Sequence, residues 1–316
     1  MSRIGRPNIA VSSGARPVHS AERATTLNLF VSLRPNQWTK NLIIFAGLIF
    51  GQRLFDPTAA ARSIGTFAAF CGLSGVVYLI NDITDREQDR WHPVKRGRPI
   101  ASGALPVRTV LTAAVIIGSA GLGWSFWISA RLGVVALTYL ALLTAYSLLL
   151  KHVVILDVLT IAVGFVLRAV AGAVAVSVPI SHWLLVCTIL LALFLALSKR
   201  RHELVLLAED ATGHRPILEE YSPYLLDQMI GVVTASTVVS YILYTTDAET
   251  AARFGTRLLG LTIPLPLYGI FRYLYLVHQK GGGTPSELLL TDRPLVVCVA
   301  LWALAVVLIV YRPFGL

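Results

Sequence analysis

The chain is poor in charged residues. Asp, Glu, Lys and Arg make up only 14% of its 316 residues, against about 25% in a typical soluble protein. Hydrophobic residues make up 55%, and the mean hydropathy is +0.70. These values exclude an ordinary soluble globular protein. We therefore expect a single polytopic membrane domain.

Cysteine is also scarce. The three cysteines, Cys71, Cys187 and Cys298, lie far apart in apolar runs, and none has metal-binding spacing. They are expected to be buried core thiols. Several enzyme motifs are missing too: the sequence has no Walker A or GxGxxG loop after a strand, no GxSxG elbow and no HExxH pair. The chemistry must therefore be sought in other residues.

The N-terminal 27 residues lack the apolar core of a signal peptide. They are polar and contain four arginines. The sequence therefore predicts a disordered basic N-terminal tail over residues 1–27, followed by a nine-helix transmembrane catalytic domain over residues 28–316.

Nine apolar stretches are long enough to cross a bilayer, which takes about 20 residues. The first is the least regular, because polar residues such as Asn36 and Gln37 interrupt it. The sequence thus predicts an all-α polytopic membrane protein. Its nine transmembrane helices are expected over residues 28–52, 59–80, 108–129, 132–150, 154–178, 182–198, 229–246, 256–278 and 293–311.

Basic residues gather on one side of these spans. That side receives the N-terminal tail, the 83–107 loop, Lys151, the 199–228 loop and Lys280. The positive-inside rule makes it cytoplasmic. We expect the chain to be a multi-pass protein of the plasma (inner) membrane with its active site on this side. An odd number of spans then places the N-terminus inside and the C-terminus outside. The net charge of +10 suits a lipid bilayer and phosphorylated substrates better than nucleic acid. The apolar outer faces permit a homo-oligomer.

An acidic cluster stands where the second expected span ends, in the stretch YLINDITDREQD. Asp82, Asp85 and Asp89 fall within a sector of roughly 60° on a helix, with Asn81 beside them. Carboxylates at such a short separation repel one another unless a cation lies between them. Hard oxygen ligands beside room for phosphate oxygens favour Mg²⁺. We therefore expect Asn81, Asp82 and Asp85 to bind a magnesium–diphosphate unit at the cytoplasmic end of the bundle.

A cationic loop follows directly, in the stretch DRWHPVKRGRPIASG. Lys95, Arg96 and Arg98 lie there near a Pro/Gly-rich turn, which is typical of phosphate binding. Positive-inside topology alone would also explain these charges, but topology does not require the neighbouring acids.

A second polar group occupies the fifth span and the residues before it. It contains Tyr146, Lys151, Asp157 and, deeper, Arg168. Asp157 and Arg168 lie about 20° apart on a continuous helix, three turns from one another. A buried arginine needs a partner or a wet cavity. Two interpretations remain open: an interhelical ion pair, or an Asp157 that faces the acidic cluster and completes a second cation site.

Two further groups are expected on the same side. The stretch RPNQWTKN contains Arg34, Lys40 and Asn41, and a lysine inside a span indicates a cavity-facing role. The stretch SKRRHE contains Lys199, Arg200 and Arg201. A stop-transfer cluster is the alternative explanation there.

These motifs resemble a known family. NDITDREQD matches the NDxxDxxxD motif of the UbiA superfamily of intramembrane prenyltransferases, and the resemblance runs from about residue 28 to the C-terminus. Most members have a second DxxxD on the fifth span, but here Ile161 stands four residues after Asp157. Two further motifs, RPNQWTKN and the spacing of Tyr146, Lys151 and Asp157, make the chain similar to one branch of this superfamily, the decaprenyl-phosphate phosphoribosyltransferases.

The resemblance implies a glycosyl transfer for cell-wall arabinan synthesis. The donor is phosphoribosyl diphosphate, the acceptor is decaprenyl (polyprenyl) phosphate, and Mg²⁺ assists departure of the diphosphate. Asp89 would hold a ribose hydroxyl or a second ion. The expected catalytic residues are Asp82, Asp85, Asp89, Lys151 and Asp157. The phosphates would be bound by the residues Arg34, Lys40, Lys95, Arg96, Arg98, Tyr146, Lys151, Arg168, Lys199, Arg200 and Arg201.

Two other functions compete with this one. An aromatic polyprenyltransferase of quinone biosynthesis uses the same acidic cluster, but the missing second DxxxD argues against it. A lipid-phosphate or ion transporter also has intramembrane charges. A carrier does not need three carboxylates beside a cationic loop.

Overall fold

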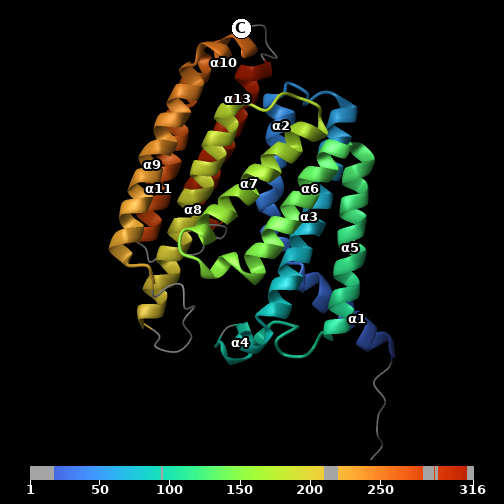
Figure 1. Ribbon diagram of the computed structural model, residues 1–316. Helices are drawn as coiled ribbons and strands as arrows, with labels where there is room; N and C mark the ends of the chain where they lie inside the picture. The colour runs from blue at the N-terminus through green and yellow to red at the C-terminus, as the bar shows by residue number, and fades with distance from the viewer. Residues whose placement is uncertain (1–17, 94, 210–219, 280–287, 289–290, 312–316) are drawn as a thin grey trace, which may run out of the picture.

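The computed structural model describes residues 18–93, 95–209, 220–279, 288 and 291–311, which contain helices and no strand (Figure 1). The expected all-α fold is therefore confirmed. In chain order the elements are α1 (Val18–Ser32), η1 (Pro35–Ile44), α2 (Phe45–Phe50), α3 (Pro57–Thr84), α4 (Arg86–Trp91), η2 (Lys95–Gly97), α5 (Val107–Ile128), α6 (Ala130–Leu148), η3 (Leu150–His152), α7 (Leu156–Ala175), α8 (His182–Glu209), α9 (Pro223–Thr246), α10 (Ala248–Phe254), η5 (Leu258–Thr262), α11 (Pro264–Gln279) and α13 (Arg293–Tyr311).

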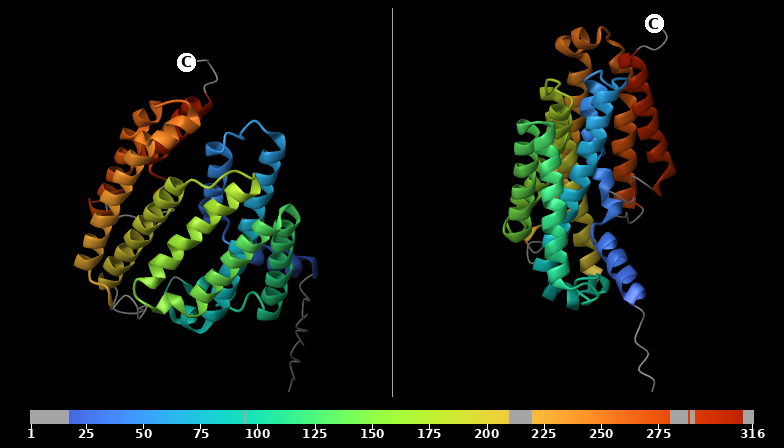
Figure 2. Two further views of the ribbon diagram at one scale, coloured as in Figure 1. Left: turned by 45° about the horizontal axis from the view of Figure 1, so that its top comes forward. Right: turned by 90° about the vertical axis from the view of Figure 1, so that its right-hand side faces the viewer.

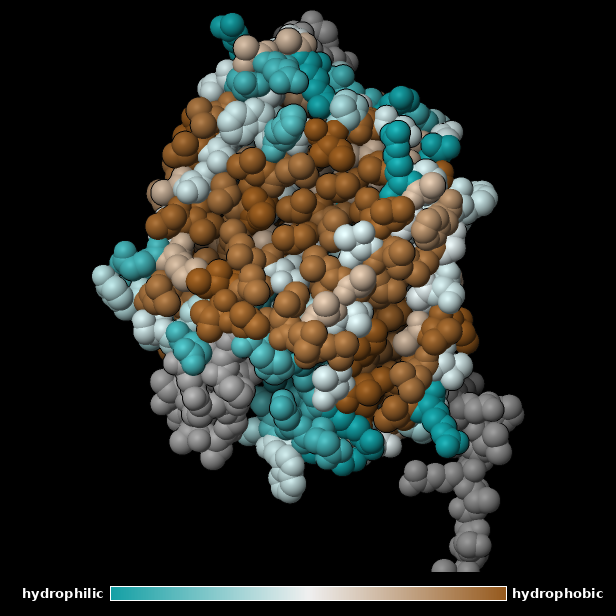
Figure 3. Space-filling view, viewed as in Figure 1, coloured by the Kyte–Doolittle hydropathy of each residue, from teal (hydrophilic) through white to brown (hydrophobic). Residues whose placement is uncertain are grey.

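Among the described residues, eight helical segments are long and apolar enough to cross a membrane. They correspond to eight of the nine expected spans. A broad apolar surface covers the middle of the molecule, with hydrophilic residues at its two ends (Figure 3). This is the pattern of a multi-pass membrane protein. The segments are Pro57–Thr84, Val107–Ile128, Ala130–Leu148, Leu156–Ala175, His182–Val205, Pro223–Thr246, Leu258–Gln279 and Arg293–Tyr311.

The remaining expected span, residues 28–52, is not a continuous helix. Pro35 disfavours the right-handed α-helical region for Arg34, which ends α1. Arg34 adopts a left-handed conformation (φ 52°), and Pro35 then begins a 3-10 helix. The segment still runs from the end of the molecule that contains α4 to the opposite end (Figure 1). Because α1 begins at Val18, residues 18–27 of the expected disordered tail are helical. Residues 1–17 lie outside the described residues.

Consecutive long helices pack side by side from α3 to α9, so the bundle follows the chain order (Figure 2). One core joins η1, α3, α6 and α7 around Ile44, Phe70 and Tyr139. A second core joins α7, α8, α9 and α11 around Phe194 and Leu226. Helix α7 belongs to both cores and therefore lies at the centre of the bundle.

The last helix closes the bundle at the end opposite α4. Tyr311 donates a hydrogen bond to the Leu48 or Ile49 carbonyl oxygen (3.2 and 3.0 Å). The Gln52 amide donates to the Val310 carbonyl (3.3 Å). These contacts fix α13 to α2, so elements from both ends of the chain surround a common interior.

Two glycines allow the η1–α2 segment to lie directly on α7. A Cβ atom at Gly172 would stand 2.0 Å from the Ile44 carbonyl oxygen, and one at Gly47 would stand 2.6 Å from the Ala173 nitrogen. The backbones touch here because neither residue has a side chain. This contact sets the position of Lys40 and Asn41 relative to α7.

We expect Gly172→Ala to lower the thermal unfolding temperature of the detergent-solubilised protein. Its methyl group meets backbone that has no room to move, and overpacking of this kind costs about 1–3 kcal/mol. Gly118→Ala in α5 is the matched control, since its Cβ would meet nothing closer than Val76 at 3.8 Å. Equal unfolding temperatures for the two variants would contradict this account of the α2–α7 contact.

Candidate active site

The acidic cluster lies where α3 gives way to α4. The two helices are almost continuous: the Asp85 amide bonds to the Asn81 carbonyl (2.9 Å), and the Asp89 amide bonds to the Asp85 carbonyl (2.8 Å). Asp82, Asp85 and Asp89 therefore stay close to one helical face, as expected. Asp82 and Asp89 are buried.

Each of these carboxylates is paired with a cation. Arg98 bridges two of them, because its Nη1 donates to Asp82 (3.0 Å) and to Asp89 (2.6 Å). Arg34 also donates to Asp82 (2.5 Å). The structure thus brings an arginine before η1 and an arginine after η2 onto the end of α3.

The third carboxylate has partners of its own. Lys151, from η3, donates to Asp85 (2.5 Å), and the Asn81 amide donates to the other oxygen of Asp85 (3.1 Å). Lys151 is only 5% exposed. Four residues that were predicted from the sequence to bind substrate or metal therefore meet at this cluster. They are Arg34, Asn81, Arg98 and Lys151.

The donor set fits Mg²⁺ by its chemistry, since carboxylate and amide oxygens are the ligands that this ion prefers. Among the described residues, however, no three His, Cys, Asp or Glu side chains converge closely enough to hold a metal ion. The carboxylates turn toward arginine and lysine, which relieve the repulsion that we expected a metal ion to relieve. Metal binding by Asn81, Asp82 and Asp85 therefore requires these carboxylates to change partners.

Asp157 forms a second cluster with Arg200 and Tyr221. Ile155, with φ 69°, turns the chain before α7, and Asp157 enters the first turn of that helix fully buried. Its two oxygens accept from Arg200 of α8 (2.7 Å) and from Tyr221 (2.9 Å). The interhelical ion pair, one of the two interpretations that the sequence left open, is thus present between Asp157 and Arg200. The second cation site stays a prediction.

Arg200 and Tyr221 stabilise the charge of Asp157. Arg200 also contacts Glu203 (2.6 Å) and donates to the Tyr146 hydroxyl (3.2 Å). Burial raises the pKa of Tyr221 to about 12, so its phenol stays protonated and remains a donor. Asp157 thus holds Arg200, which lines the interior cavity.

Arg168 does not pair with Asp157. Its Nε donates to the Asn41 side-chain oxygen and its Nη2 donates to the Tyr139 hydroxyl, both at 2.7 Å. The guanidinium also lies over the rings of Tyr139 and Phe165. Helix α7 turns Asp157 toward α8 and Arg168 toward η1 and α6, so the interhelical ion pair found here involves Asp157 and Arg200.

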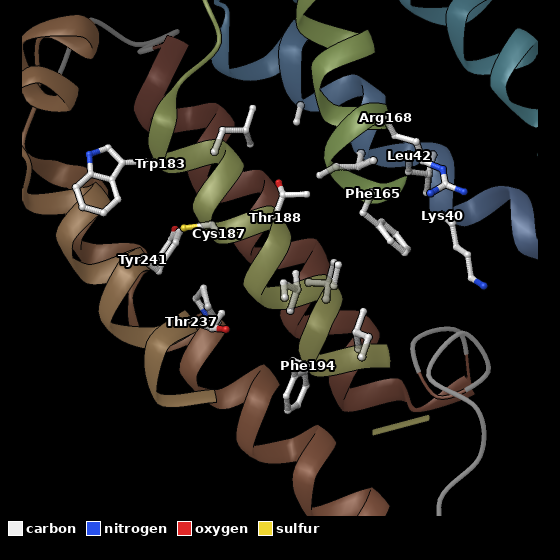
Figure 4. Close-up of a pocket in the computed structure, with 18 of the residues that line it drawn as sticks. Lys40, Leu42, Phe165, Arg168, Trp183, Cys187, Thr188, Phe194, Thr237 and Tyr241 are labelled. Atoms are coloured by element: carbon white, nitrogen blue, oxygen red, sulfur yellow. The ribbon is translucent and has the colours of Figure 1, made fainter. Parts of the chain in front are cut away.

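A large cavity of about 1490 Å³ extends along the interior of the bundle. It is polar near the acidic cluster and mainly apolar beyond it, where α8, α9, α11 and α13 line it. Figure 4 shows Arg168 and Lys40 on one side of this space and Trp183 and Tyr241 across it. The expected site residues that line it are Arg34, Lys40, Asn81, Tyr146, Arg168, Lys199 and Arg200.

Several expected site residues do not line this cavity. Arg201 points elsewhere and pairs with Asp227, so the stop-transfer alternative suits it better. Lys95 and Arg96 lie in η2 at the end of the molecule, and Arg96 is exposed. Arg98 of that loop reaches Asp82 and Asp89.

Sequence reasoning missed two residues of the site. Tyr139 lies one helix away from Arg168, and Tyr221 lies 64 positions from Asp157. An isolated tyrosine in an apolar or loop segment has no local signal that reveals such a contact. Only the packing of the helices brings these hydroxyl groups to their partners.

The fold and the site together define an all-helical, membrane-spanning transferase with its polar residues at one end of a long cavity. The chain belongs to the UbiA prenyltransferase family, which matches residues 41–291. The expected family is thereby confirmed.

Curated relatives match almost the whole chain. Decaprenyl-phosphate phosphoribosyltransferase of Mycolicibacterium smegmatis is 33% identical over 307 residues, which cover 92% of this chain and 95% of the relative. The protein of the same name from Corynebacterium glutamicum is 34% identical, over 89% of this chain and 86% of its own length.

A solved structure has the same fold. The UbiA homologue from Archaeoglobus fulgidus bound to GPP and Mg²⁺ superposes with a TM-score of 0.69 at 18% identity, covering 90% of this chain and 99% of its own. At this identity the likeness shows the fold alone.

Proposed function

We propose that the protein transfers 5-phosphoribosyl from phosphoribosyl diphosphate to decaprenyl phosphate, with release of diphosphate, and so supplies a precursor of cell-wall arabinan. The observation that carries the proposal is the cluster of Arg34, Arg98 and Lys151 on the acids at one end of a long apolar cavity. Such a site suits a donor rich in phosphate and an acceptor with a lipid tail. The near full-length similarity to enzymes of this name supports the same reaction.

The reaction needs little proton transfer. An oxygen of the acceptor phosphate forms a bond to the anomeric carbon, while the bond from that carbon to the diphosphate oxygen breaks and diphosphate leaves with the electron pair. Because the acceptor is already an anion, no general base is required. Positioning and charge stabilisation supply the catalysis.

The acidic cluster has the central role in this proposal. Asn81, Asp82 and Asp85 would hold Mg²⁺, which when bound makes the diphosphate a better leaving group. The cations that now pair with the acids would bind phosphate oxygens instead. Asp89 would hold a ribose hydroxyl.

The second cluster would position the substrates. Asp157 and Glu203 hold Arg200 in place, and Arg200 with Tyr146 faces the cavity. Lys199 lines the same wall, and Lys95 and Arg96 would cover the 5-phosphate of the donor from the loop. We place this end of the bundle on the cytoplasmic side of the plasma membrane, with the N-terminus inside and the C-terminus outside.

We expect membranes that contain the protein to transfer ribose-labelled phosphoribosyl diphosphate to decaprenyl phosphate when Mg²⁺ is present. The measurement is mass spectrometry of the lipid product. Membranes without the protein are the control. Transfer of a polyprenyl group to hydroxybenzoate would support the aromatic prenyltransferase instead, and recovery of an unchanged substrate across the membrane would support a transporter.

A further inference from the structure

Lys40 and Arg168 differ from the other cations of the site. Arg34, Arg98, Lys151 and Arg200 each lie within 3.0 Å of a carboxylate oxygen. Among the residues that the structure describes, no carboxylate lies within salt-bridge distance of Lys40 or Arg168. Both residues line the large cavity.

The contacts of Arg168 orient its charge without neutralising it. Arg168 is 6% exposed, and the hydrogen-bond partners of its guanidinium, the Asn41 amide oxygen and the Tyr139 hydroxyl, are both uncharged. Asn41 is itself held by the Ser74 hydroxyl of α3 (3.4 Å) and by Cys71 (3.3 Å). Helices α3, α6 and η1 therefore support one guanidinium that faces the cavity.

An anion is the missing partner. A buried charge without a counter-charge is unfavourable, and the nearby ammonium of Lys40, which lies within electrostatic reach of Arg168, adds repulsion. Two cations beside a fixed hydroxyl group suit a phosphate monoester, which presents two negative charges and three acceptor oxygens. The site is therefore built for a ligand phosphate.

The position of the site favours the lipid acceptor over the donor. Ser74 precedes Asp82 by eight residues of α3, so the Arg168 group lies about 12 Å farther along the bundle than the acids. Apolar side chains surround it, among them Leu42 and Phe165 (Figure 4). A lipid phosphate can reach this depth with its tail in the apolar cavity, whereas a water-soluble sugar phosphate gains nothing there.

We propose that Lys40 and Arg168 form the subsite for the phosphate of the polyprenyl phosphate acceptor, separate from the acidic cluster that binds the donor. This inference rests on the proposed function for the identity of the acceptor. The other phosphate monoester in the reaction is the 5-phosphate of the donor, and the experiments below separate the two.

Arg168→Gln should raise the KM for decaprenyl phosphate roughly 10- to 100-fold, as expected for the loss of hydrogen bonds from a charged group. The KM of the variant for phosphoribosyl diphosphate should stay within about twofold of the wild-type value. Arg253→Gln is the matched control, because Arg253 is an exposed arginine that lines the same cavity from α10. A rise in the KM for the donor, or no change for either substrate, would overturn the assignment.

A binding measurement makes the test independent of turnover. Farnesyl phosphate should raise the unfolding temperature of the wild-type protein in detergent, farnesol and ribose 5-phosphate should not, and Arg168→Gln should lose the effect. If the wild type lacks transferase activity but shows this pattern, the subsite stands and the proposed function fails. Equal stabilisation of wild type and Arg168→Gln, or stabilisation by ribose 5-phosphate through Arg168, overturns the subsite.

The unfolding temperature without ligand separates a binding role from a structural one. Arg168→Gln leaves no carboxylate unpaired, so it should unfold close to the wild-type temperature. Arg200→Gln should unfold at a lower temperature, because it leaves the buried Asp157 without its counter-charge. A decrease for Arg168→Gln as large as that for Arg200→Gln would assign Arg168 to the fold and reject the proposal.

Discussion

Asp82→Asn is expected to reduce turnover by at least about 10²–10³-fold, the usual consequence of removing a group that stabilises charge in a transition state. The amide keeps the shape of the side chain and still accepts a hydrogen bond from Arg34 or Arg98, but it no longer supplies the negative charge that Mg²⁺ requires. The residual activity should need a higher Mg²⁺ concentration than the wild type.

The Mg²⁺ dependence matters because Asp82 also has a structural role. Its loss leaves two arginines without their shared partner, and breaking a buried ion pair costs about 3–5 kcal/mol. If the variant is only less stable, its activity per folded molecule should still require the same Mg²⁺ concentration as the wild type. Glu87→Gln is the matched control, because Glu87 is an exposed acid of the same stretch that pairs with Arg90. Full turnover by folded Asp82→Asn protein would refute the role of Asp82 in metal binding.

Lys151→Ala is expected to have the second large effect, a loss of about 10²-fold or more in kcat/KM for the donor. Lys151 touches the acidic cluster and is buried against Asp85. In the proposed reaction it leaves Asp85 when Mg²⁺ binds and neutralises a phosphate oxygen of the donor. Its removal should weaken donor binding without weakening metal binding, since Asp85 keeps its charge.

Steady-state kinetics at several Mg²⁺ concentrations test this prediction. His152→Ala controls for disturbance of η3, because His152 is the adjacent residue and is exposed. A wild-type rate for Lys151→Ala would return Lys151 to the topological role that the positive-inside rule also allows.

The spans were predictable because hydropathy is a local property. About 20 consecutive apolar residues suffice to predict a membrane-spanning helix, and eight such segments recur in the structure. The break in the first segment also had a local cause, the Arg34–Pro35 step, but an average over a window of residues conceals it.

The shared face of the acids was predictable for the same reason. The helical repeat alone places Asp82, Asp85 and Asp89 together. Their partners were not predictable, because Lys151 lies 66 positions from Asp85 and Arg34 lies 48 positions from Asp82. The packing of segments that are distant in the sequence determines which residues pair.

Asp157 illustrates what a periodic pattern leaves out. Spacing along an ideal helix places Asp157 and Arg168 on nearly the same face. In the structure, however, Asp157 bonds to Arg200 and Arg168 bonds to Asn41. The two partners differ because a helix in the centre of a bundle has neighbours on every side. Knowing the face does not identify the neighbour.

The central claim is that the acids at the end of α3 bind a divalent cation that holds the diphosphate of the donor. A structure determined with Mg²⁺ and phosphoribosyl diphosphate tests it most directly. We predict a metal ion about 2.0–2.1 Å from oxygens of Asn81, Asp82 and Asp85, with Arg34 and Lys151 moved onto phosphate oxygens. A bound donor with Asp82 still on Arg34 and Asp85 still on Lys151, and no metal between protein and diphosphate, would contradict the account.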